Sequence, residues 1–322
     1  MTSTPAANAE QGGRARPLVL VAILVVVNLI WAGQFIAIKA IEHGLGPFAI
    51  AFLPFVVATP LMLPLLYRKR AVSAVRPSAA DWGAFGIAAG LGQIVCMGGM
   101  TWAGVVGQAS NCAILYLLIP VLSAVMAPLM LGERLTRLRK LALAIGLVGV
   151  LVMSVKDLRD SDFLASRYMM GNLLMIIGCL GACFYNVYCK RLMRTFDELD
   201  VLIYTYIATT PIGVLIVAVT EPDALARLAR LDARGWAAFA FLAVMVLALS
   251  MILFFAVLKS LPVTVALSST YMMPVFGVVL AMLLLGERLT TLNVVGAGLV
   301  LGSTMLVMRY DTDPERPATE ER

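Results

Sequence analysis

Residues able to make or break covalent bonds are scarce in this sequence. Its 322 residues include one histidine, His43, and five cysteines. A hydrolytic Ser or Cys needs a neighbouring base, and His43 lies in a short segment between two apolar stretches. No Asp or Glu lies near the centre of an apolar stretch, so the paired carboxylates of aspartyl chemistry are missing too. We therefore expect no catalytic residue, no metal site and no cofactor.

The polar residues that remain lie within long apolar stretches, where each is costly unless it has a partner. Amides, hydroxyls and aromatic rings would bind a polar solute in a hydrated cavity. The alternative is hydrogen bonding between helices, which we favour for any single Ser or Thr. The predicted substrate-binding residues are Trp31, Gln34, Gln93, Asn111, Tyr185, Asn186, Ser268 and Tyr271.

The composition is that of an integral membrane protein. Hydrophobic residues make up 61% of the chain and charged residues 14%, against about 25% charged in soluble domains. Apolar stretches of about 20 residues are long enough to cross the bilayer as helices, and only helices or closed barrels satisfy the backbone there. We predict an all-α protein with ten transmembrane helices at 18–40, 46–67, 82–104, 108–130, 138–155, 169–189, 200–219, 235–258, 262–285 and 292–309.

The net charge of +6 does not indicate nucleic-acid binding, because the basic residues lie in short runs between apolar stretches. Most of the 25 Lys and Arg residues fall on one side if the N-terminus is inside, which predicts two cytoplasmic termini in the inner membrane. Residues 1–17 and 310–322 are predicted to be cytoplasmic tails, and residues 156–168 a connecting loop.

An internal repeat is the most specific feature of the sequence. Leu131–Thr136 reads Leu-Gly-Glu-Arg-Leu-Thr and reappears at Leu285–Thr290, and Pro120 and Pro274 lie equally far before the two motifs. Residues 18–155 and 169–309 are then two five-helix repeats. Five is odd, so the repeats enter the membrane in opposite orientations, as in many secondary transporters with a central cavity. The alternative is a duplication retained only for folding.

Charged residues also recur in the repeat. Lys39 and Lys190 lie near corresponding helix ends, where each either reaches the lipid headgroups or contacts a substrate carboxylate. Glu133 and Glu287 are interpreted, with Pro120 and Pro274, as structural or gating residues. Each glutamate would cap the following helix or pair with a loop arginine, and the alternative is a gating ion pair.

Glycines four residues apart predict close helix contacts as well. The two pairs are Gly86 with Gly90 and Gly298 with Gly302.

These motifs resemble the EamA-type transporters of the drug/metabolite transporter superfamily. The resemblance rests on ten spans, the Trp31–Lys39 run and the two Pro/Leu-Gly-Glu-Arg-Leu pairs, and it covers residues 18–309. Gln34 and Ala182 depart from the asparagine and tryptophan that are more frequent there. The family implies a basket-like bundle with a central cavity.

The resemblance and the neutral polar lining together favour a secondary transporter or facilitator that moves amino acids or related zwitterions, with export favoured. The alternatives are a multidrug or other organic-solute exporter of the same fold, or a non-transporting membrane scaffold. Expected partners are a small-molecule substrate and the lipid bilayer, without nucleic acid. A monomer would suffice to enclose the cavity, and proton coupling stays open because the spans lack central acids.

Overall fold

The computed structural model describes residues 5–70, 77–106, 115–133, 135–153, 166–276, 279 and 291–310. Every regular element in this part of the chain is helical. Two predicted residues, Asn111 and Glu287, lie outside the described residues, and the side chain of Lys39 is not described. The elements are α1 (Pro5–Ile41), α2 (Pro47–Arg70), α3 (Ala79–Ile87), η1 (Ala88–Ile94), α4 (Val95–Val106), α6 (Leu118–Leu131), α7 (Arg137–Met153), α9 (Ser166–Leu192), α10 (Glu198–Thr220), α11 (Ala224–Ala229), α12 (Ala233–Ala240), η2 (Phe241–Ser250), α13 (Met251–Ser260), α14 (Val263–Ser268), η3 (Ser269–Tyr271) and α16 (Thr291–Tyr310).

The chain is a multi-pass membrane protein. Six described helical runs are long and apolar enough to cross a bilayer, and three further apolar helices are shorter. Ten crossings remain a prediction, because parts of the predicted fourth and ninth spans fall outside the described residues. The six long runs are Leu18–Ile38, Pro47–Tyr67, Ala79–Val106, Met169–Leu192, Glu198–Thr220 and Ala233–Ser260, and the shorter helices are Leu118–Leu131, Val263–Phe276 and Val294–Leu306.

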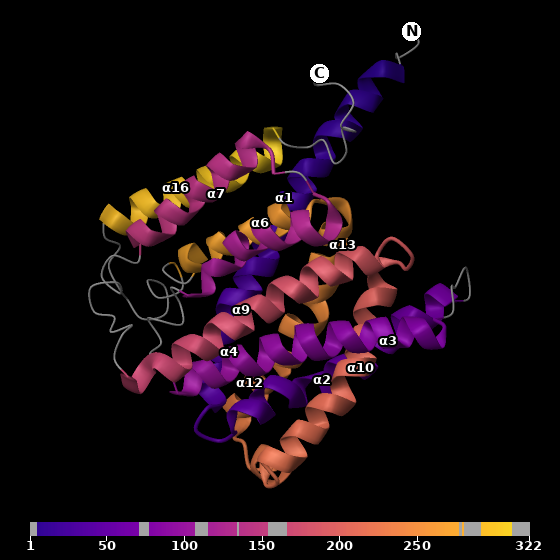
Figure 1. Cartoon of the computed structure of the whole chain (residues 1–322), viewed down its shortest axis with the longest axis vertical. Helices are drawn as coiled ribbons and strands as arrows, with labels where there is room; N and C mark the ends of the chain where they lie inside the picture. Colours follow the sequence, from indigo (N-terminus) through magenta and orange to yellow (C-terminus); the bar gives the residue numbers. More distant parts are fainter. Residues whose placement is uncertain are drawn as a thin grey trace.

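Helices at matching places in the two repeats make matching contacts (Figure 1). The run α3–η1–α4 packs through η1 and α4 on α9, and its counterpart α12–η2–α13 packs on α1. The second helices of the repeats, α2 and α10, pack on each other, and so do the last helices, α7 and α16. The repeat in the sequence is therefore also a repeat in the packing.

Two stretches of π-helix interrupt corresponding helices. The segment η1 lies between α3 and α4, and η2 lies between α12 and α13. A π-helical stretch shifts the faces that the following residues present, and such stretches are frequent at functional sites. Gln93 lies within η1, and Ser250 is the last residue of η2. Nothing in the spacing of the apolar residues signals either stretch.

Close helix contacts occur at glycines other than the predicted pairs. A Cβ added at Gly86, Gly90, Gly298 or Gly302 would meet no described atom within 4 Å, so the prediction of close contacts there is wrong. Close approaches instead join α7 to α16, where an added Cβ at Gly149 would lie 2.9 Å from Gly296 O, and α4 to α9. An added Cβ at Gly181 would lie 2.7 Å from the backbone nitrogen of Cys96, and one at Gly99 would lie 3.0 Å from the Cα of Gly178.

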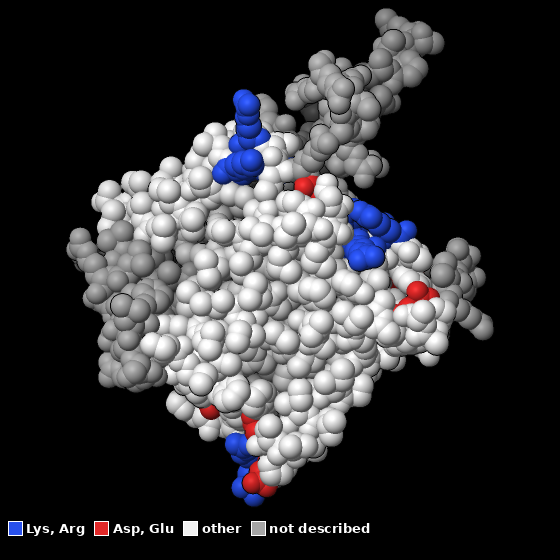
Figure 2. Space-filling view, in the orientation of Figure 1, with Lys and Arg blue, Asp and Glu red and all other residues white. Residues whose placement is uncertain are grey.

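Charged side chains separate into distinct regions on the visible face, with an uncharged surface between them (Figure 2). The α10–α11 end comprises residues 42–46 and 221–232, joined where Phe48 N donates to Glu221 Oε1 at 2.8 Å. The α13–α14 end comprises residues 132–133, 135–136, 193–197 and 261–262. There Arg194 Nη2 donates to Leu131 O at 3.1 Å, and Lys259 Nζ donates to Asp197 Oδ1 at 2.9 Å. An uncharged belt between charged ends suits a bilayer.

We predict that Gly181→Ala lowers the thermal unfolding midpoint in detergent by several degrees. The new methyl group would collide with backbone atoms of α4, and overpacking of this kind typically costs about 1–3 kcal/mol. The matched control is Gly86→Ala, whose methyl group enters open space and should leave the midpoint unchanged or slightly raised. Equal midpoints for the two variants would contradict the described α4–α9 contact.

Candidate functional site

The polar face of α1 contacts the third and fourth helices of the second repeat. Trp31 Nε1 donates to Ser250 Oγ at 2.8 Å, and the Trp31 ring lies 5.1 Å from the ring of Phe254. Three residues earlier on α1, Asn28 Nδ2 donates to Ser269 Oγ at 3.0 Å. One helix of the first repeat is thereby joined to η2, α13 and η3 of the second.

Asn28 retains one polar atom without a partner. Its side chain is fully buried, and its Oδ1 accepts no hydrogen bond from the described residues. An unpaired buried acceptor costs about 1–3 kcal/mol, which a bound donor such as water or a substrate N–H would offset. Asn28, Trp31 and Gln34 recur every three residues and share one face of α1, so the sequence already makes Asn28 a candidate for a polar cavity lining.

Other predicted residues lie apart from this contact. Gln93 is 3% exposed in η1, and Gln34 is half-buried on α1. The hydroxyl of Tyr185 lies 2.9 Å from Thr205 Oγ1 of α10. Asn186 Nδ2 donates within its own helix to Ala182 O at 2.8 Å, and its Oδ1 also has no partner among the described residues.

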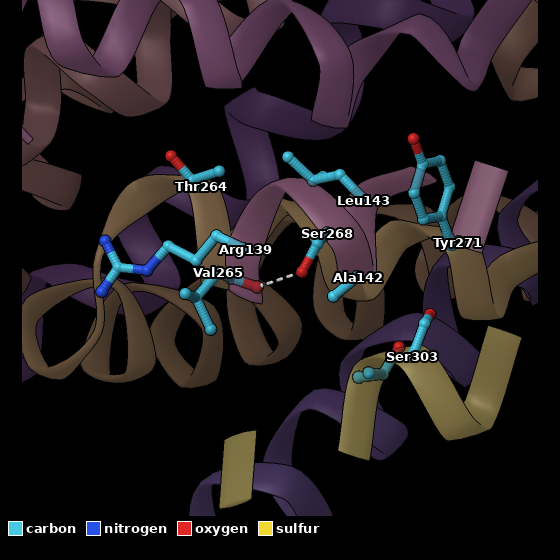
Figure 3. Close-up of a pocket in the computed structure, with 9 residues that line it drawn as sticks. Arg139, Ala142, Leu143, Thr264, Val265, Ser268, Tyr271 and Ser303 are labelled. Carbon is cyan, nitrogen blue, oxygen red and sulfur yellow. Dashed lines mark hydrogen bonds between the residues drawn. The ribbon is translucent and has the colours of Figure 1, made fainter. Parts of the chain in front are cut away.

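Ser268 and Tyr271 line a different, narrow cleft between α14, α7 and α16 (Figure 3). The cleft has a volume of about 10 Å³, which leaves room for about one water molecule. The Tyr271 ring lies against Gly146, where an added Cβ would meet its Cδ2 atom at 2.6 Å. The side chain of Tyr271 is 1% exposed, and its hydroxyl is without a partner in the described part of the chain. Arg139, at the start of α7, also lines the cleft, and sequence reasoning did not select it.

The structure thus places the predicted substrate-binding residues at several positions rather than around one described cavity. Ser268 faces the cleft, whereas Ser269 beside it faces Asn28, because successive helical residues point about 100° apart. A central cavity remains a prediction. Its described part would be the α1 contact site, which we define as Asn28, Trp31, Ser250, Phe254 and Ser269.

The two charged residues of the repeat whose side chains the structure describes, Lys190 and Glu133, hold helix ends. Lys190 Nζ donates to the carbonyls of Leu258, Lys259 and Leu261 at 2.5, 2.8 and 3.1 Å. Glu133 Oε1 accepts from Val263 N at 2.8 Å, and Oε2 lies 3.4 Å from Thr264 Oγ1. The helix that Glu133 caps is α14 of the other repeat, rather than the helix that follows Glu133 in the chain.

The two prolines lie on helices that contact each other. Pro120 is buried in α6, and its carbonyl accepts from Ser123 Oγ at 2.7 Å. Pro274 is half-buried and follows η3. The fourth helices of the two repeats contact each other through α14 and α6, with Pro120 near the start of α6 and Pro274 after η3.

Comparison with known proteins decides the family. The sequence matches the EamA-like transporter family over residues 18–155 and 169–309. The chain belongs to this family. The two matched ranges coincide with the two predicted repeats, so the family match confirms the sequence resemblance.

Among the relatives of this EamA-like chain is an uncharacterized transporter from Archaeoglobus fulgidus, 24% identical over 88% of this chain and 95% of the relative. A protein from Streptantibioticus cattleyicolor, named a probable terminal-alkyne amino-acid exporter, is 23% identical over 92% of this chain and 95% of its own length. One solved crystal structure has a TM-score of 0.72 at 18% identity and covers 89% of this chain and 96% of that one, which shows a shared fold. The names of both sequence relatives are those of transporters and not of enzymes.

We predict that Ser250→Ala lowers the thermal unfolding midpoint by several degrees. The substitution leaves the Trp31 Nε1–H without its acceptor in a packed interface, a loss of about 1–3 kcal/mol. The matched control is Ser260→Ala, an exposed serine at the end of α13 that bonds its own helix. In the Trp31→Phe background, Ser250→Ala should cost much less than it does alone. An equal cost in both backgrounds would contradict the Trp31–Ser250 bond.

Proposed function

We propose that this EamA-like protein is a secondary transporter or facilitator that moves amino acids or related zwitterions across the cytoplasmic membrane by alternating access, with export as the favoured direction. Family membership supports transport. The relative named as an amino-acid exporter supports the substrate class, at 23% identity.

The observation that carries the proposal is the unpaired Asn28 Oδ1 within the α1 contact site. The site combines an amide oxygen, two serine hydroxyls and two aromatic rings. Neutral oxygens accept hydrogen bonds from an ammonium group, and the rings of Trp31 and Phe254 would pack against an apolar side chain. Because the site draws on both repeats, a solute bound there would contact both moving units.

The contacts at the two ends support opposite insertion of the repeats. The loop after the first helix of repeat one lies at the α10–α11 end, and the loop after the first helix of repeat two lies at the α13–α14 end. Most of the 25 lysines and arginines belong to the two termini and to the connecting segments on the same side of the membrane as the α13–α14 end. We assign that end to the cytoplasm, together with both termini.

The positions of the acidic residues bear on whether transport is coupled to protons. The predicted spans contain no central Asp or Glu that would carry a proton across the membrane. We therefore propose a facilitator or exchanger, or an exporter coupled through groups near the helix ends.

We predict that purified protein in proteoliposomes exchanges labelled neutral amino acids in counterflow without a pH gradient. Asn28→Ala should reduce this exchange about tenfold, the effect of losing about 1.4 kcal/mol of substrate hydrogen bonding, and should lower the thermal midpoint because the bond to Ser269 Oγ is lost. The control Thr220→Val alters an exposed residue at the end of α10 and should exchange normally.

The same assay distinguishes the alternatives. A panel of amino acids, sugars, nucleosides and organic cations should show exchange of amino acids only. Exchange of organic cations alone would replace the amino-acid assignment with a multidrug or organic-solute exporter. No exchange of any member would support a non-transporting scaffold.

A further inference from the structure

The turn between α13 and α14 is short and lacks caps of its own. The helix α13 ends at Ser260 and α14 begins at Val263. Leu261 is extended, with φ −119° and ψ 155°, and Pro262 precedes the first residue of α14. Proline has no side-chain oxygen to accept from the first amides of a helix, as Ser, Thr, Asp or Asn would. The free groups at both helix ends therefore depend on other parts of the chain.

A cation from α9 binds the C-terminus of α13, just before the turn. Lys190 Nζ binds three carbonyl oxygens at the end of α13. A positive charge is favourable at a helix C-terminus, where the free carbonyls carry partial negative charge. Lys190 belongs to the first helix of the second repeat, so this contact joins the first and third helices of that repeat.

An anion from the first repeat binds the N-terminus of α14, just after the turn. Glu133 accepts from Val263 N and lies near Thr264 Oγ1. The preceding glycine places it there: Gly132 has φ 72° and ends α6 with a bond from its N–H to Pro128 O. Only glycine adopts this left-handed conformation readily. The Leu-Gly-Glu motif thus ends one helix and caps another.

We propose that Lys190 and Glu133 form a charge clamp that locks the cytoplasmic gate of the transporter. Both charges hold the same two-residue turn, and Glu133 does so across the boundary between the repeats. If α14 moves away from the end of α6, as opening of this face requires, Glu133 must release Val263. The clamp thereby stabilises the state in which the α13–α14 end is closed. This inference rests on the alternating access proposed above.

The experiment reads the conformation from each side of the membrane. In a chain without its five native cysteines, Ser268→Cys places a thiol in the cleft beside α14. A membrane-impermeant maleimide is applied to inside-out and right-side-out vesicles. Glu133→Ala and Lys190→Met should raise the cytoplasmic labelling rate about three- to tenfold, the shift expected from losing one charge-assisted cap.

A matched variant separates gating from simple helix capping. Asp232 Oδ1 accepts from Gly235 N at 2.7 Å and caps its own helix, α12, at the α10–α11 end. Asp232→Ala should lower the unfolding midpoint without changing cytoplasmic labelling. Glu133→Gln keeps an acceptor for Val263 N but loses the charge, and it should give an intermediate labelling rate.

The result that would overturn the clamp is a Glu133→Ala protein that unfolds earlier but labels like the Asp232→Ala protein. This outcome is separate from failure of the proposed function, because labelling needs no substrate. If the wild type exchanged no solute while the labelling shifted as expected, transport of the tested solutes would be rejected and the clamp retained. Normal exchange with unshifted labelling would reject the clamp alone.

Discussion

Satisfaction of helix ends is the constraint on which this structure depends. In a bilayer, each backbone group without an internal partner is costly, and every break between helices exposes several such groups. This chain satisfies four of the described ends with charges from elsewhere: Lys190 at the end of α13, Glu133 at the start of α14, Glu221 at the start of α2 and Arg194 at the end of α6. Because both glutamates belong to the repeat opposite to the helix they cap, the same bonds that complete the helices also join the repeats.

Much of the fold could be predicted from the sequence because it follows from composition and repetition. Apolar length predicts helices, and the duplicated Leu-Gly-Glu-Arg-Leu-Thr motif predicts two repeats, whose limits agree with the family match. The π-helical segments η1 and η2 could not be predicted, because in a helix with apolar residues on all sides a change of period leaves no pattern. The prediction of close contacts at Gly86 was wrong for a similar reason. Glycine spacing identifies a smooth helix face, but the position of the partner helix decides whether that face is covered, as it is at Gly181.

The residue types of a candidate site could be chosen from the sequence, but their arrangement could not. In the structure Trp31, Tyr185, Asn186 and Tyr271 make hydrogen bonds or keep an unpaired polar atom, and their role in substrate binding stays a prediction. Which neighbour each residue faces depends on the rotation of its helix, and the sequence contains no fixed reference for that rotation. Ser268 and Ser269 are adjacent, yet one lines the cleft with Arg139 and the other binds Asn28. The spacing of residues along one helix does not identify a polar partner on a helix far away in the sequence.

Two carboxylate caps of similar geometry have different mechanical consequences in this fold. Glu221 at the end of α10 binds the start of α2, and those two helices also pack directly on each other, so the cap adds to an interface that exists without it. Gly46 is needed there because a Cβ would collide with the Glu221 carboxyl. Glu133 instead holds the first amide after a two-residue turn, where few other backbone bonds restrain the chain. A cap within a long interface adds stability to a single arrangement of the helices. A cap on a short turn can break when the turn moves, and only a few hydrogen bonds are lost. In the proposed clamp, the position of a charge relative to the packed interfaces, rather than its chemistry, therefore separates a structural contact from a gating contact.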